Sequence, residues 1–140
     1  MTILNDVLDF SKIEAGKMDL DARDVDLRAV VDGVLDTLAI EADRRNLELI
    51  GFVDRGLPAL VRGDAGRLRQ ILVNLAGNAL KFTEQGEIEI RLEPAGAGAG
   101  LVRATVRDTG IGIPYEHQSA IFDAFVQAHP NDPRSHGGTG

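Results

Sequence analysis

Apolar residues recur at helical spacing in three stretches of the chain. Residues 3–13, 27–45 and 67–82 each carry apolar side chains three or four positions apart, which is the repeat of one helix face. Gly16 is suited to end the first helix, and Asp64 is suited to be the N-cap of the third. The apolar face expected for the third helix consists of Leu68, Ile71, Leu72, Leu75, Ala79 and Phe82.

Alternation of apolar and polar residues predicts strands elsewhere. Residues 87–93 and 101–107 alternate in this way, as strands with one buried face do. Residues 94–100 between them are rich in alanine and glycine and indicate a flexible hairpin connection. Residues 47–53 predict a further strand, and residues 19–26 predict an acidic, irregular segment.

The remaining segments are short. Residues 57–60 fit either a loop or a short strand, Pro114 opens a short helix that reaches Phe125, and residues 127–140 have loop composition. Helices and antiparallel strands are therefore mixed along one chain. This pattern predicts an α+β fold with helices packed on one face of a sheet.

Composition and charge exclude several classes of protein. The 140 residues suffice for one domain. With 15 Lys and Arg against 22 Asp and Glu, the net charge is −7, so we expect no nucleic-acid partner. No cysteine is present, which excludes disulfides, thiolate catalysis and cysteine-based zinc sites. No apolar run approaches the roughly 20 residues that span a bilayer, so we expect no direct membrane contact in this segment.

A polar face on the third expected helix is the first candidate for chemistry. Spacings of four and three residues bring Asn74, Asn78 and Lys81 to one side of that helix. An asparagine amide oxygen is a suitable ligand for Mg²⁺, and a lysine one turn later can meet a phosphate as a point charge. A plain solvated helix face would show the same pattern.

Two glycine-rich segments follow. Asp108, at a strand end, could accept a hydrogen bond from an amine, and Gly110 and Gly112 allow a ligand ring to approach the backbone. An ordinary turn from strand to helix would use the same residues. The backbone amides of residues 134–140 could cradle phosphate oxygens, although a plain C-terminal tail has the same composition. Neither segment is a P-loop or a dinucleotide fingerprint.

The histidines offer no further site. His117, His129 and His136 lack the spacing of a metal site, and we expect each to be solvated. No arrangement of Ser, His and Asp for nucleophilic catalysis is legible, so we assign no catalytic residue within the chain.

The order of the motifs resembles the ATP-binding domain of sensor histidine kinases, within the wider family of gyrase-like and chaperone ATPases. The motifs are N-x-x-x-N-A-x-K-F-T at 74–83, D-T-G-I-G-I at 108–113, I-F-x-x-F at 121–125 and G-G-T-G at 137–140. The resemblance implies an α/β sandwich with helices on one face of a mixed, mostly antiparallel sheet.

The resemblance also implies a division of the chain. The N-terminal L-N-D-V-L-D-F-S-K-I-E-A-G-K-M is similar to the end of the second dimerisation helix of hybrid kinases that carry receiver domains. Residues 1–18 would be the end of that helix, and residues 19–140 an ATP-binding domain that is incomplete at its C-terminus. A cytoplasmic location is implied, in a parent protein that can be anchored to a membrane.

By the same resemblance, the bound molecules would be ATP and Mg²⁺. Asn78 would bind the metal with support from Asn74, Lys81 would contact phosphate, and Phe82 would lie against the adenine. Asp108 would accept a hydrogen bond from the adenine amino group in a pocket shaped by Gly110 and Gly112. The remaining implied site residues are Phe125 at the base of a mobile lid, Arg134 as a lid cation, and Gly138, Thr139 and Gly140 at the phosphates.

Position 74 separates kinases from their hydrolytic relatives, which carry a glutamate four residues before the metal-binding asparagine. An amide is no general base near neutral pH, so Asn74 favours a protein histidine kinase over a gyrase-like or chaperone-like hydrolase. The acceptor would be a histidine on a dimerisation helix absent from this chain, and we therefore expect the isolated fragment to be inactive.

The implied partners are the dimerisation helices of a homodimeric kinase and the receiver domain of a response regulator. A second hypothesis is a non-catalytic interaction fragment, whose first apolar stripe (residues 3–13) would pair with dimerisation helices.

Overall fold

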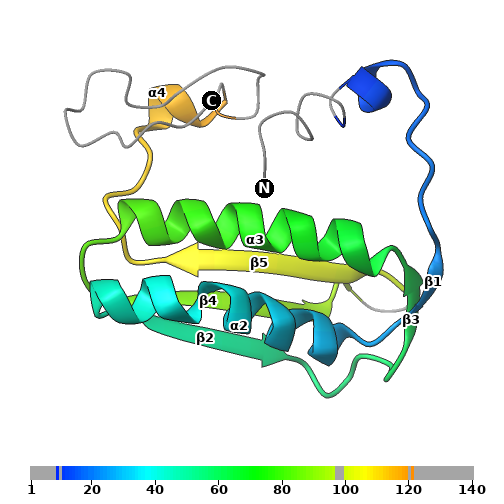
Figure 1. Cartoon of the computed structure of the whole chain (residues 1–140), viewed down its shortest axis with the longest axis horizontal. Helices are drawn as coiled ribbons and strands as arrows, with labels where there is room; N and C mark the ends of the chain where they lie inside the picture. Colours follow the sequence, from blue (N-terminus) through cyan, green and yellow to red (C-terminus); the bar gives the residue numbers. More distant parts are fainter. Residues whose placement is uncertain (1–8, 10, 97–99, 120, 122–140) are drawn as a thin grey trace. The chain divides into compact units, whose positions relative to one another are not determined.

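The computed structural model describes residues 9, 11–96, 100–119 and 121. The chain divides into two compact units. The larger unit, Leu20–Ile111, contains the helices α2 and α3 and the strands β1 to β5 (Figure 1). The other unit joins Met1–Asp19 to Gly112–Gly140, and its described part includes the short helix α4, Tyr115–Gln118.

Three strands of the larger unit form a mixed sheet in the order β2-β4-β5. β2 (Glu48–Val53) is parallel to β4 (Glu87–Pro94), and β4 is antiparallel to β5 (Val102–Asp108). The three predicted strands are thus confirmed to within one residue at each end. β4 is central, and its side chains Ile88 and Ile90 are fully buried.

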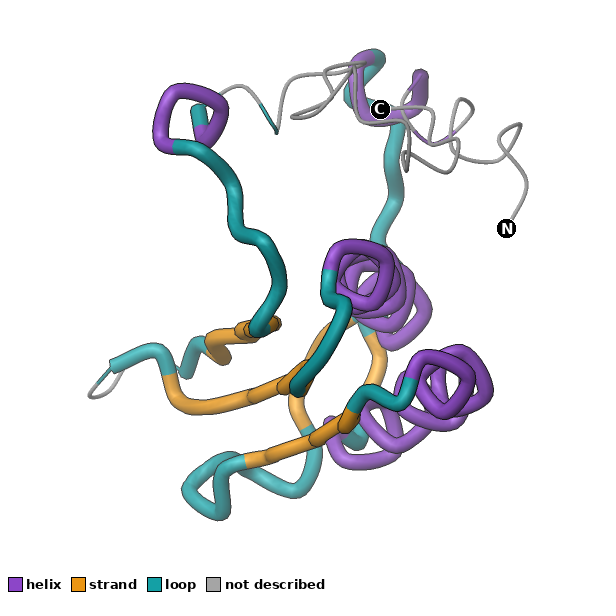
Figure 2. Tube along the Cα trace, turned by 90° about the vertical axis from the view of Figure 1, so that its left-hand side faces the viewer, coloured by secondary structure: helices purple, strands orange, loops and turns teal. Residues whose placement is uncertain are grey.

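Both long helices cover one face of this sheet. α2 (Leu27–Arg45) and α3 (Ala65–Phe82) lie on the same side of the strands, which is clear when the unit is viewed along the helices (Figure 2). β1 (Arg23–Val25) and β3 (Val61–Gly63) pair separately as a small antiparallel sheet. The predicted α/β sandwich, with helices on one face of a mixed sheet, is confirmed.

Capping residues fix the helix boundaries. Asp26 accepts hydrogen bonds from the backbone N–H groups of Arg28 and Ala29 at the start of α2, and α2 has the predicted bounds. Asp64 accepts from the N–H of Arg67 at 3.0 Å, as predicted, and also from the N–H of Asp21 at 3.1 Å. These bonds, first from Arg67 and then from Asp21, hold the pKa of Asp64 below its ordinary value.

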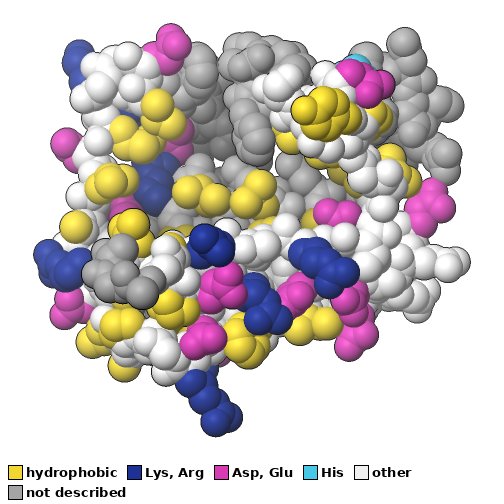
Figure 3. Space-filling view, turned by 180° about the vertical axis from the view of Figure 1, so that it is seen from behind, with side chains coloured by type: hydrophobic (Ala, Val, Ile, Leu, Met, Phe, Trp, Pro, Cys, Tyr) yellow, Lys and Arg dark blue, Asp and Glu magenta, His cyan; other side chains and the backbone are white. Residues whose placement is uncertain are grey.

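The face of the sheet opposite the helices is polar. Arg91 lies 4.3 Å from the centre of the Phe52 ring and pairs with Glu89, and Arg103 pairs with Glu93 at 3.6 Å. Figure 3 shows basic and acidic side chains interspersed on this side. The sandwich therefore has two layers in the described part of the unit, with the core between helices and sheet.

One prediction about a short segment was wrong. Residues 23–25 within the acidic segment form β1, because their partner strand β3 lies far along the sequence and local composition does not reveal it. Residues 57–60 form a loop, which is one of the two alternatives stated for them, and the strand β3 follows at Val61–Gly63. The first predicted helix is described as helical at residues 9 and 11–14, and the predicted helix from Pro114 is described at Tyr115–Gln118.

The inner face of α3 also differs from the prediction. Ile71, Leu75 and Phe82 are 55%, 44% and 39% exposed. Ala76 and Leu80 are buried in their place. α3 carries more apolar residues than one face can bury, and a small residue such as Ala76 lets the helix backbone approach the sheet closely. Three apolar side chains therefore share the outer side of α3 with its asparagines.

No helix in the described part of the chain combines the length and apolar character that crossing a membrane requires.

Alanine substitution should have opposite effects on stability at two glycines, Gly51 in the packing of α2 on β2 and Gly77 on an open side of α3. A Cβ at Gly51 would lie 2.7 Å from Leu35 Cδ1 and 2.8 Å from Val31 Cγ1. We expect Gly51→Ala to lower the free energy of unfolding by about 1–3 kcal/mol, as overpacking does. Gly77, inside α3, has no atom within 4 Å of a Cβ, so Gly77→Ala should raise stability by up to about 1 kcal/mol. Urea unfolding of both variants measures this, and equal shifts would contradict the close approach of α2 to β2.

Candidate functional site

The last turn of α3 lies against the bend that follows β5. The backbone N–H of Ile111 donates to the carbonyl oxygen of Phe82 at 3.4 Å. A Cβ on Gly110 would lie only 2.5 Å from the same oxygen. Glycine at position 110 is therefore required for this approach, which brings the asparagine motif and the aspartate motif of the sequence to the same end of the unit.

The outer side of α3 presents amides at one-turn intervals. Asn74, Asn78 and Phe82 follow one another at four-residue spacing, and all three are exposed. Neither asparagine side chain forms a hydrogen bond with any described residue. Their amide oxygens are therefore open to an outside ligand. Lys81 Nζ lies 5.1 Å from the centre of the Phe82 ring, a cation–π distance that keeps its charge beside this face.

α2 supports the same end of α3. The last carbonyl groups of a helix have no partner within the helix, and Arg45 Nη1 donates to the carbonyl of Leu80 at 3.1 Å. Arg45 is itself held by Glu41, whose carboxylate accepts from Nε at 2.7 Å. The position of the Asn78–Phe82 turn is thus fixed from α2 as well as from the sheet.

Asp108, the last residue of β5, has a fixed carboxylate. Its Oδ1 accepts a hydrogen bond from the backbone N–H of Gly110 at 2.8 Å. Its Oδ2 has no hydrogen bond with any described residue, and the side chain is exposed. Asp108 therefore offers one oriented oxygen to a donor from solvent or from a ligand.

Thr109 attaches the bend to the loop between α3 and β4. Its Oγ1 donates to the carbonyl of Gln85 at 3.1 Å and accepts from the N–H of Glu87 at 3.1 Å. Its own N–H donates to the carbonyl of Glu87 at 3.2 Å. Gly86 lies directly beneath this hydroxyl, with φ +112, and a Cβ there would overlap Thr109 Oγ1.

Sequence reasoning missed the roles of Gly86 and Thr109. The sequence offered one signal for Gly86, which is its position directly before the strictly alternating residues 87–93. Its partner, however, is 23 residues further along, so spacing alone could not connect the two.

Four of the predicted site residues, Asn74, Asn78, Lys81 and Phe82, lie on α3. Two more, Asp108 and Gly110, belong to the bend that contacts Phe82. Gly112 belongs to the other unit, where it is exposed with φ +70, a conformation that favours glycine. The other five predicted residues lie outside the described residues: Phe125, Arg134, Gly138, Thr139 and Gly140.

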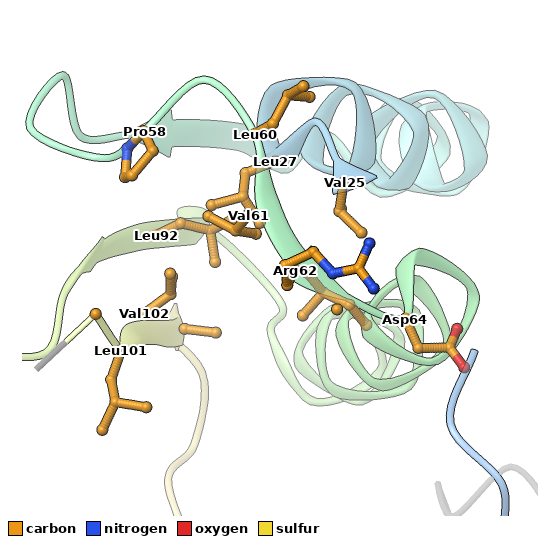
Figure 4. A pocket seen from close by; sticks show the side chains of 14 residues that line it. Val25, Leu27, Pro58, Leu60, Val61, Arg62, Asp64, Leu92, Leu101 and Val102 are labelled. Atoms are coloured by element: carbon orange, nitrogen blue, oxygen red, sulfur yellow. The ribbon is translucent and has the colours of Figure 1, made fainter. Parts of the chain in front are cut away.

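A separate cavity of about 580 Å³ lies beside the small β1–β3 sheet (Figure 4). Its walls are mainly apolar and include Val25, Leu60 and Leu101, and the polar lining residues include Arg62 and Asp64. None of the predicted site residues lines it. It borders the first residues of β5, whereas Asp108 is the last, so the cavity and the candidate site lie at opposite ends of that strand.

The comparisons with known proteins agree on one family. Residues 63–140 match the family described as histidine kinase-, DNA gyrase B- and HSP90-like ATPase. The signal transduction histidine-protein kinase BarA of Escherichia coli (strain K12) is 47% identical over 142 residues, covering 100% of this chain and 16% of that protein. Hybrid signal transduction histidine kinase L of Dictyostelium discoideum is 44% identical over 142 residues, covering 100% of this chain and 8% of that protein.

A solved structure gives the same match. The crystal structure of full-length ShkA in complex with AMPPNP superposes with a TM-score of 0.81 at 38% identity, covering 89% of this chain and 26% of that chain. The chain thus corresponds to a small part of the length of these relatives.

The attachment of Thr109 predicts a difference between two glycines that have similar positive φ angles. Gly86 and Gly96 have φ +112 and +119, but no atom lies within 4 Å of a Cβ at Gly96. Alanine should therefore meet a similarly unfavourable φ at both positions and an additional collision only at 86. We expect Gly86→Ala to lower the free energy of unfolding by about 1–3 kcal/mol more than Gly96→Ala. Paired urea unfolding curves measure the difference, and coincident curves would show that Thr109 does not hold the bend.

Proposed function

The chain belongs to the family of histidine kinase-, DNA gyrase B- and HSP90-like ATPases, and from this membership we propose that it binds Mg-ATP at the candidate site for phosphoryl transfer to a histidine outside these residues. The observation that carries the proposal is the contact between the Phe82 carbonyl and the Gly110–Ile111 backbone. Through that contact a face of free amides and an oriented carboxylate adjoin each other, and a nucleotide needs both kinds of group.

At the base end, Asp108 recognises the adenine. Its Oδ1 is already engaged by Gly110, so Oδ2 accepts the hydrogen bond from the amino group of the base. Gly110 has no side chain to obstruct the bend, and the half-exposed ring of Phe82 lies against the base.

At the phosphate end, Asn78 holds Mg²⁺ through its amide oxygen, with support from Asn74, and Lys81 contacts a phosphate. Amide oxygens that form no hydrogen bond within the described chain fit this metal, which prefers oxygen ligands. Bound Mg²⁺ neutralises charge on the phosphates during transfer. By the family resemblance we assign Phe125 and Arg134 to a lid, and Gly138, Thr139 and Gly140 to phosphate binding.

Asn74 favours transfer over hydrolysis. Water needs a general base for attack, and an amide cannot accept the proton. The nucleotide therefore remains bound until a histidine imidazole reaches its terminal phosphate. The names of the relatives, which are histidine kinases, support this choice.

The same proposal assigns the parts of the chain and its partners. Residues 1–18 are the end of the second dimerisation helix, and residues 19–140 are the ATP-binding domain. The acceptor histidine belongs to a dimerisation helix of a homodimeric parent kinase, and the phosphoryl group passes on to the receiver domain of a response regulator.

Replacement of Asp108 tests the adenine assignment. Asp108→Asn should weaken binding of a non-hydrolysable ATP analogue with Mg²⁺ by at least about tenfold, since a charged hydrogen bond contributes about 1.5–3 kcal/mol. Titration calorimetry measures the affinity. Asp54→Asn is a matched control, because Asp54 Oδ1 accepts from the N–H of Gly56 at 2.6 Å in the same D-x-G arrangement, next to the far end of β4. An equal loss in both variants, or none in either, would exclude the adenine role.

Removal of the metal tests Asn78. The unmodified chain should lose affinity for the ATP analogue when Mg²⁺ is chelated, whereas Asn78→Ala should bind almost equally with and without the metal. Ile71→Ala, which changes an exposed side chain on the same helix, should keep the metal dependence of the unmodified chain. If Asn78→Ala also keeps it, the metal is held elsewhere.

A further inference from the structure

The hydroxyl group of Thr83 is buried without a partner. Thr83 is 1% exposed, and its Oγ1 is, among the buried side-chain polar atoms of the described residues, the one with no hydrogen bond. Desolvating a hydroxyl without compensation costs free energy, and valine has nearly the same shape without that cost. A threonine at this position therefore calls for an explanation.

The end of α3 does not supply the explanation. Thr83 is the C-cap residue of α3, but it caps the helix with its backbone, whose N–H donates to the carbonyl of Ala79 at 3.0 Å. A valine could form the same bond. The hydroxyl is thus not needed to end the helix.

The surroundings of the hydroxyl are those of the candidate site. A Cβ built on Gly110 would lie 2.9 Å from Thr83 Oγ1, 2.8 Å from Asp108 Oδ1 and 2.5 Å from the Phe82 carbonyl oxygen. Three oxygen atoms therefore surround the position that a Cβ of Gly110 would occupy. The Thr83 hydroxyl and the Asp108 carboxylate therefore lie beside the same point.

The chemistry of these atoms fixes the direction of any bond. A carbonyl and a carboxylate can only accept, so the hydroxyl of Thr83 must be the donor toward either of them. The carbonyl of Phe82 already accepts from Ile111. The carboxylate of Asp108 carries a full charge and draws the stronger bond.

We propose that Thr83 is a positioning residue of the nucleotide site, whose hydroxyl donates to the Asp108 carboxylate when a nucleotide is bound. This inference rests on the proposed function. Because Thr83 Oγ1 is shielded from solvent, it acts on the nucleotide through Asp108 and not by direct contact. It keeps the carboxylate turned toward the amino group of the base.

The test compares free-state stability with nucleotide affinity. In the nucleotide-free chain the hydroxyl has no bond to lose, so Thr83→Val should unfold at the same urea concentration as the unmodified chain or at a higher one. In titration calorimetry with Mg²⁺ and the ATP analogue, the same variant should bind about tenfold more weakly. Thr105→Val, at an exposed threonine of β5, is the matched control and should leave the affinity unchanged.

A double-mutant cycle shows whether Thr83 works through Asp108. Thr83→Val should cost about tenfold in the unmodified background and almost nothing in the Asp108→Asn background, since coupled residues are not additive. Equal losses in the two backgrounds, or unchanged affinity in Thr83→Val, would overturn the proposal. A loss of affinity matched by a loss of free-state stability would also overturn it, because that result indicates a purely structural role.

A second pair of variants guards against poor folding of the valine variant. Thr83→Ser and Thr83→Ala both lack the methyl group, and only the serine keeps the hydroxyl. Serine should retain affinity, and alanine should lose it. Affinity for the ATP analogue in the unmodified chain, together with its loss in Asp108→Asn, tests the proposed function separately, so a failure of either idea can be recognised.

Discussion

The candidate site depends on the close approach of two backbone segments, the end of α3 at Phe82 and the bend at Gly110. The approach is possible only because residue 110 has no side chain, and three separate attachments maintain it. Arg45 holds the last carbonyl groups of α3, Thr109 holds the bend to the 85–87 loop, and Ile111 bonds to Phe82 directly. The side chains that we propose to bind the nucleotide, such as Asn78 and Asp108, are therefore held in place by backbone contacts that have no binding role themselves.

Much of the fold could be predicted from the sequence because its signals are local. The caps Asp26 and Asp64 act within three residues, and the alternation in β4 is continuous. Prediction failed where the deciding partner is remote. β1 exists only through its pairing with β3, and Ile71 and Leu75 are exposed because Ala76 allows the neighbouring stripe of α3 to face the sheet.

The candidate site shows the same limit. Asn74, Asn78, Lys81 and Asp108 could be selected because each motif has a recognisable spacing. Thr109, Gly86 and Thr83 could not, because their roles arise from contacts between the bend after β5 and the segment that ends α3 and begins β4. A motif indicates which groups meet a ligand, whereas the residues that hold those groups in place are visible only in three dimensions.

The described part of the site comes from one uninterrupted stretch of chain, from Asn74 to Gly110, and this has a consequence for folding. Within this stretch the longest attachment, from Thr109 to the carbonyl of Gln85, closes a loop with a sequence separation of 24. Short loops lose little entropy on closure and can form quickly. The parallel pairing of β2 with β4 instead joins two strands that have the whole of α3 between them in the sequence. We therefore expect this pairing to form more slowly than the attachments of the site, to which β2 contributes no residue.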